Sequence, residues 1–140
     1  MLIKKTNSQG QKDFQKGEDK EDRSLIYRKW LRTVNCGYFC DIDFIKWKYV
    51  NGMPVARAIT DLTRTDSLEV SDSYLKAIID RIFNRDSQGK ILEKLGNLLK
   101  IPVYLVLFPK SMKWLQVFSF QKKEWRNFTP LNWSLYLKNL

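Results

Sequence analysis

Three aspartates stand in two short clusters of an apolar stretch, and their positions favour a cation site. Asp41 and Asp43 are separated by one residue, and Asp61 begins the triplet 61–63. Aspartate is depleted in β-strands, and a buried carboxylate is costly unless it is paired or bound to a metal. Mg²⁺ is usually held by one or two carboxylates together with water and phosphate. The two clusters therefore predict a Mg²⁺ site, which Mn²⁺ would also fit.

The charge of the chain favours a polyanionic partner, and we expect this partner to be nucleic acid. The 140 residues include 25 Lys and Arg against 15 Asp and Glu, which gives a net charge of +10, and there is no His. Residues 1–23 hold six of the basic and five of the acidic residues, so the rest of the chain keeps a net charge of +9. Such an excess suits phosphate-rich ligands. Without His, any hydrolysis must use carboxylates, lysine and metal-bound water.

The composition predicts a polar, disordered tail over residues 1–23 and one folded domain over 24–140. No apolar run approaches the ~20 residues that span a bilayer, and the first residues lack the apolar stretch of a signal peptide. Cys36 and Cys40 are too few for a zinc shell in a chain without His. We interpret both as reduced thiols and expect a cytoplasmic protein that contacts no membrane.

Hydrophobic periodicity predicts an α/β (α+β) domain in which helices flank a central mixed β-sheet. Asn51-Gly52 is a strong hairpin signal between two strands. Helices follow that hairpin before the next strand, so we expect the strands on either side of them to be parallel. The expected elements are a helix over 25–33 capped by Ser24, strands 38–50 and 53–64, helices from 74 and from 88 (the second capped by Ser87), strands 101–108, 114–121 and 125–128, and a helix from 130.

The register of the hairpin decides whether the aspartates meet. A two-residue turn pairs Val50 with Met53 and places Asp43 opposite Thr60, which turns Asp43 and Asp61 to opposite faces. A three-residue loop, or a bulge with the same effect, places Asp43 opposite Asp61 with Cβ atoms ~5 Å apart. A shared metal requires the second register.

This layout resembles the PD-(D/E)XK nuclease superfamily, which has a restriction-endonuclease-like fold. Asp41 or Asp43 matches the first acid of the family pattern, and the triplet 61–63 matches its acid-x-Lys strand. The resemblance covers roughly residues 24–108 and departs from the family at Thr63, where the pattern has Lys. It implies Mg²⁺-dependent hydrolysis of DNA, with Lys90 on a following helix as a candidate for the missing cation.

The resemblance implies catalytic roles for Asp43, Asp61, Thr63 and Lys90, and it assigns the metal to Asp41, Asp43 and Asp61. Thr63 would position water by hydrogen bonding. Further residues are expected to contact nucleic acid: Lys46, Lys48, Arg57, Arg64, Arg85 and Gln88.

Three functions remain open at this point: a DNA endonuclease, a catalytically inactive nucleic-acid-binding domain, and a protein-interaction domain whose basic face meets an acidic partner. The sequence is also compatible with a homodimer. The aspartates have structural alternatives, because ion-pair networks gather charge as well. Asp43 could pair with Arg57 or Lys46, and Asp61 could be held by Arg64 or by a helix N-terminus.

Overall fold

The computed structural model describes residues 25–34, 39–67 and 69–140. Contacts divide the chain into two units, Met1–Phe39 and Cys40–Leu140. In the first unit, α1 covers Leu25–Thr33. The expected disordered tail, the Ser24 cap and Cys36 lie outside the described residues, and the single domain over 24–140 stays a prediction. No helix among the described residues is long and apolar enough to cross a membrane.

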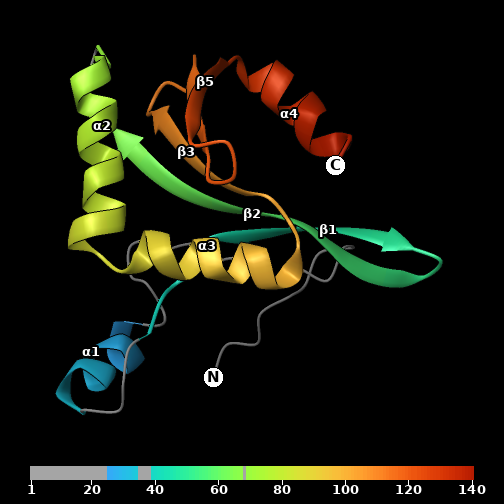
Figure 1. The fold of residues 1–140 in the computed structure, drawn as a ribbon, viewed down its shortest axis with the longest axis horizontal. Coiled ribbons are helices and arrows are strands. Elements are labelled where there is room, and N and C mark those ends of the chain that lie inside the picture. Colours follow the sequence, from blue (N-terminus) through green and yellow to red (C-terminus); the bar gives the residue numbers. More distant parts are fainter. Residues whose placement is uncertain (1–24, 35–38, 68) are drawn as a thin grey trace, which may run out of the picture. The chain divides into compact units, whose positions relative to one another are not determined.

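The second unit is an α+β fold built on a five-stranded mixed sheet, as Figure 1 shows. The strands lie in the order β1-β2-β3-β4-β5. The β2–β3 pair is parallel, as expected for a helical crossover, and the other pairs are antiparallel. The elements are β1 (Phe44–Val50), β2 (Met53–Thr65), α2 (Asp72–Asp80), the π-helical turn η1 (Arg81–Arg85), α3 (Gln88–Leu99), β3 (Val103–Pro109), β4 (Leu115–Ser119), β5 (Glu124–Phe128) and α4 (Pro130–Lys138).

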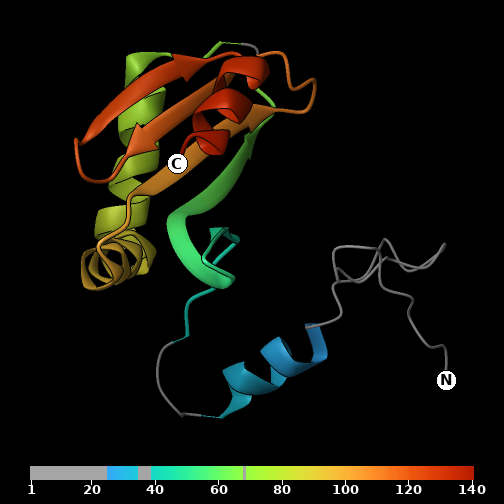
Figure 2. The same ribbon diagram turned by 90° about the vertical axis from the view of Figure 1, so that its right-hand side faces the viewer.

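Helices cover both faces of this sheet, so side chains that alternate along a strand enter two separate apolar clusters. Ile59 and Leu105 pack with Ile82 and Leu92 beneath α2, η1 and α3. On the other face, Val106 packs with Trp133 of α4 and neighbouring side chains. Figure 2 shows α4 in front of the strands and α2 behind them. The continuous apolar run of β3 follows from this burial on two faces.

The β1–β2 hairpin begins with a tight turn and then shifts its register. Asn51 and Gly52 both have positive φ, 53° and 78°, as the two central residues of a type I′ turn require. Farther along, Trp47 pairs with Ala56, but Lys46 pairs with Ala58. Arg57 is therefore the extra residue of a β-bulge, which leaves one residue unpaired and increases the local twist.

Capping side chains begin α2 and α4. The hydroxyl of Ser71 accepts a hydrogen bond from Tyr74 N at 3.2 Å, and Thr129 accepts from Asn132 N at 3.1 Å. Ser87 precedes α3 as predicted, but its side chain makes no capping bond.

The chain after α2 widens into the π-helical turn η1 before the break that precedes α3. The amide of Asp86 donates to the carbonyl of Arg81 at 2.8 Å, an i→i+5 bond that carries the turn as far as Arg85. Single π-helical turns of this kind are frequent at functional sites.

Lys100 caps the C-terminus of helix α3, and its φ of 57° lies in the left-handed region. In that conformation a residue with a Cβ is roughly 1 kcal/mol less favourable than glycine. The backbone amide of Lys100 donates to the carbonyl of Gly96, which packs closely against β3. A Cβ at Gly96 would lie 2.4 Å from Val103 Cγ2 and 3.1 Å from the carbonyl oxygen of Ile101.

Gly96→Ala should therefore lower the free energy of unfolding by about 1–3 kcal/mol, as overpacking of a filled core does. Denaturant unfolding measures it, with Asn97→Ala on the exposed face of the same turn as the control. Adding Val103→Ala removes the clashing methyl and should make the two substitutions less than additive. If the two effects on the free energy of unfolding simply add, the contact with Val103 is not what restricts residue 96 to glycine.

Candidate functional site

Asp41 and Asp43 precede the first strand, which corrects the expectation that they lie within it. β1 begins at Phe44 and not at Tyr38, which lies outside the described residues. The physical reason is visible at Asp43, whose Oδ2 accepts a hydrogen bond from the amide of Leu62 at 2.8 Å. The side chain thus takes the position of a main-chain acceptor, and the regular ladder ends there.

Asp43 and Asp61 nevertheless come together. Phe44 pairs with Thr60, so the next step of the register places Asp43 beside Asp61, and their carboxyl groups form a hydrogen bond. Asp61 is buried, with 6% of its surface exposed, whereas Asp43 is exposed. The turn has two residues, and the bulge at Arg57 supplies the one-residue shift that a shared site requires.

The surroundings of Asp61 disfavour its charge. Burial is the largest cause that raises the pKa of Asp61 to about 7, and the hydrogen bond and negative charge of Asp43 add to it. Gln88, the first residue of α3, opposes this shift by donating its amide Nε2 to Asp61 Oδ2 at 2.9 Å. Two carboxyl groups that share one small space are stabilised by a proton or by a cation.

Cys40 borders the same acids. Its thiol is free, and its pKa is raised by burial first and then by the negative charges of Asp61, Asp41 and Asp43. Asp41 itself is exposed. A thiol whose pKa is raised in this way is a weaker nucleophile than a free thiol.

Thr63 follows Asp61 on the same face of β2 and contacts a cation that the sequence analysis missed. The guanidinium Nη2 of Arg81, at the start of η1, lies 3.5 Å from Thr63 Oγ1. Arg81 makes no ion pair with an acid among the described residues. The sequence offers no signal that separates Arg81 from Arg85, because only the packing of η1 over β2 decides which of them reaches Thr63.

The other predicted residues divide between the two faces of the sheet. Lys90 is exposed on α3 and makes no contact with Asp43 or Asp61 in the described part of the chain. Lys46 lines a hollow beside Trp133 of α4, so it lies on the face opposite Asp61. Alternation along β1 places Lys48 on the same face as Lys46.

The remaining predicted arginines form no ion pair with Asp43 or Asp61 among the described residues. Arg64 pairs with exposed Asp66 at 3.4 Å, and Arg85 pairs with Asp80 at 3.8 Å. Arg57 occupies the bulge, where its Nε is buried without a hydrogen-bond partner in the described region. Gln88 differs from these arginines, because it donates a hydrogen bond to Asp61.

Asp43 and Asp61 are the described residues that could hold a magnesium ion. No group of three or more His, Cys, Asp or Glu that could hold a metal occurs within residues 25–34, 39–67 and 69–140. Mg²⁺ does not need such a cage, since it commonly takes one or two carboxylates and completes its shell with water and phosphate. Asp43 and Asp61 each keep one carboxylate oxygen, Oδ1, outside the bonds to Leu62 and Gln88.

Comparison of the chain with protein-family models, with curated proteins and with solved structures finds no match. Its proposed function therefore depends on the contacts, burial and charges of its own residues.

Because the pKa of Asp61 is raised, we expect the stability of the fold to depend on pH. Folded Asp61 holds its proton up to about pH 7, while the unfolded chain releases it near pH ~4. The folded state thus binds more protons in this window, and its stability falls as pH rises from about 4 to 7. Asp61→Asn removes this dependence. In EDTA its melting temperature should exceed that of the wild type increasingly from pH 4 to 8.

Asp86→Asn, at an exposed position outside the pair, should follow the wild-type pH curve in the same melting experiments. If Asp61→Asn instead melts below the wild type at pH 8, the carboxylate stabilises the fold as an anion and the pair is not strained.

Proposed function

We propose that this protein is a metal-dependent nuclease that hydrolyses DNA phosphodiesters, with a site of the PD-(D/E)XK type. The observation that carries the proposal is the contact between exposed Asp43 and buried Asp61. A polar neighbour, Gln88, and a nearby guanidinium, Arg81, complete the surroundings. Buried acids with strongly perturbed pKa values are typical of functional sites.

The architecture around the acids supports the family resemblance. The two aspartates are brought together by adjacent strands of one hairpin, and β2 is followed by helices and then by the parallel strand β3. This is the arrangement expected of a restriction-endonuclease-like core. The carboxylates meet where β1 begins, and the N-terminus of α3 supplies Gln88.

Asp43 and Asp61 are the residues that would hold Mg²⁺ or Mn²⁺. When bound, such an ion supplies positive charge for the phosphate and lowers the pKa of a coordinated water. Gln88 orients Asp61 through its hydrogen bond. The amide of Leu62 does the same for Asp43. Both carboxylates are therefore held from the protein side, which reduces the reorganisation needed during the reaction.

The reaction is hydrolysis: a water oxygen forms a new bond to phosphorus while one ester P–O bond breaks, leaving a phosphate monoester and an alcohol. Negative charge increases on the phosphate oxygens during this step, and a fixed cation stabilises it. Thr63 cannot provide that charge. Arg81, anchored at Thr63 Oγ1, is the described cation closest to this role, and we assign it in place of Lys90.

The direct test is plasmid nicking in Mg²⁺, in Mn²⁺ and in EDTA. Asp61→Asn and Asp43→Asn should each reduce cleavage to the level seen in EDTA, because an amide keeps the shape but loses the anion that a hard cation needs. Asp86→Asn is the matched control and should cut like the wild type. Wild-type protein that binds DNA but never cuts it in either metal would instead be a catalytically inactive binding domain.

Arg81→Ala should lower the cleavage rate by about 100-fold, the effect of removing one donor that stabilises transition-state charge. Arg85→Ala, four residues later on the same π-helical turn, should leave the rate within about threefold, because Arg85 pairs with exposed Asp80. Single-turnover cleavage measures both. Equal losses in the two variants would indicate general electrostatic attraction instead of a positioned cation.

A further inference from the structure

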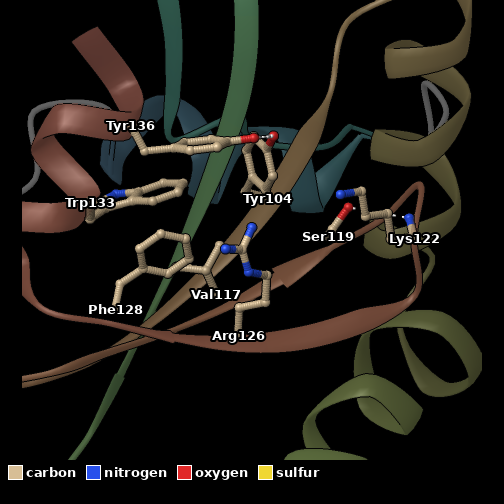
Figure 3. Close-up of a pocket in the computed structure, with 8 residues that line it drawn as sticks. All are labelled: Tyr104, Val117, Ser119, Lys122, Arg126, Phe128, Trp133 and Tyr136. Carbon is tan, nitrogen blue, oxygen red and sulfur yellow. Dashed lines mark hydrogen bonds between the residues drawn. The ribbon is translucent and has the colours of Figure 1, made fainter. Parts of the chain in front are cut away.

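A recess on the α4 face of the sheet gathers hydrogen-bond donors around an aromatic wall. Figure 3 shows Tyr104, Tyr136 and Trp133 along one side, with Arg126, Ser119 and Lys122 facing them. The hydroxyls of Tyr104 and Tyr136 lie 2.5 Å apart. This recess shares no residue with the carboxylate pair, and Tyr104 pairs across the sheet with Thr60, next to Asp61 on β2.

Two hydroxyl hydrogens of the recess are available to donate to a ligand. In a pair of hydroxyls only one hydrogen is used, so the Tyr104–Tyr136 pair keeps one O–H donor. Ser119 Oγ accepts from the amide of Lys122 at 3.2 Å, which leaves its own hydrogen available. Burial first, and then the bond to Tyr136, raises the pKa of Tyr104, so its hydroxyl stays protonated.

One of the two cations that line the recess, Arg126, lies over an aromatic ring. The guanidinium of Arg126 lies 5.1 Å from the centre of the Phe128 ring. Trp133 and Tyr136 stack with their centres 5.4 Å apart, which fixes the aromatic wall. None of the described residues that line the recess is acidic. Glu124 pairs with Ser119 across β4 and β5 but does not line the recess. Neither Lys122 nor Arg126 forms an ion pair with an acid among the described residues, so an anion could reach both cations.

A larger hollow of about 430 Å³ continues from this recess, and the two share Tyr104, Ser119 and Lys122. Lys100, at the left-handed end of α3, lines this second hollow, which also lacks an acid among its described lining residues. The recess and the hollow together form a continuous surface, called here the donor groove. Its three cations are Lys100, Lys122 and Arg126.

We propose that the donor groove binds the backbone of single-stranded nucleic acid, with phosphates at Arg126, Lys122 and Lys100. Tyr104 and Trp133 are buried, but Tyr136 and Phe128 are partly exposed. Accessible aromatic rings beside a line of cations are the combination found in single-strand binding sites. A ligand with several linked phosphates fits the connected hollows better than one isolated anion does. The proposal extends the proposed function, since nucleic acid is the ligand of both sites, but it does not require cleavage.

The test is fluorescence anisotropy with a labelled single strand of about 12 nucleotides, in EDTA and at several salt concentrations. Lys122→Ala combined with Arg126→Ala should weaken binding by about tenfold for each lost charge-assisted contact. The slope of log affinity against log salt should become shallower by about 0.7 for each contact. Both residues are exposed, so melting curves should be unchanged.

Lys110→Ala combined with Lys113→Ala is the matched control. It removes the same charge at the opposite end of the β3–β4 hairpin, and neither lysine lines the groove. This control should keep wild-type affinity and slope. Equal losses in the two double variants would overturn the proposal, because binding would then follow net charge. Tighter, groove-dependent binding of a duplex of the same sequence, or full competition by inorganic phosphate alone at equal phosphate concentration, would also overturn it.

Lys100→Gly separates a binding role from a structural one. Glycine suits the φ of 57° better than lysine does, so the melting temperature should hold or rise while single-strand affinity falls about tenfold. Unchanged affinity would remove Lys100 and the larger hollow from the site. Because all binding is measured in EDTA, groove-dependent binding without any Mg²⁺-dependent nicking would overturn the nuclease proposal and leave this one standing.

Discussion

The one-residue register shift at Arg57 is the constraint on which the candidate site depends. The Asn51-Gly52 turn fixes Val50 opposite Met53, and without the shift Asp43 would face Thr60. Because side chains alternate strictly along a strand, that register would turn Asp43 away from Asp61. The hairpin therefore keeps its two-residue turn, and the bulge shifts the pairing beyond it so that the two acids face each other.

The site keeps a carboxyl group in surroundings that disfavour its charge. Asp61 is buried beside a second acid, and one amide donor from Gln88 offsets only part of this penalty. A core built for stability alone would place an apolar residue there, as β3 does with Leu105 opposite Asp61. Retaining a strained acid is understandable where a cation relieves the strain, which is the physical basis of the proposed magnesium site.

The strand β3 connects the two proposed sites through its alternating side chains. Leu105 pairs with Asp61 and points into the cluster beneath α2 and α3, whereas Tyr104 pairs with Thr60 and points toward α4. The acids and the recess beside α4 thus lie on opposite faces of one sheet. Cations are found on both faces, with Arg81 beside Thr63 and Arg126 in the recess. This separation keeps Arg126 from neutralising the carboxylate pair.

The sequence by itself determined the α+β class and the mixed sheet, because these follow from local periodicity and the Asn51-Gly52 turn. It also pointed to Asp43 and Asp61 as partners, since acids are unusual in strands. Only the tertiary structure decided the register, because a bulge has no reliable local signature. It also decided that Arg81, and not Lys90, lies beside Thr63, and that Lys46 faces α4. Those outcomes depend on how a helix packs over a strand, and many exposed basic residues look alike in a sequence.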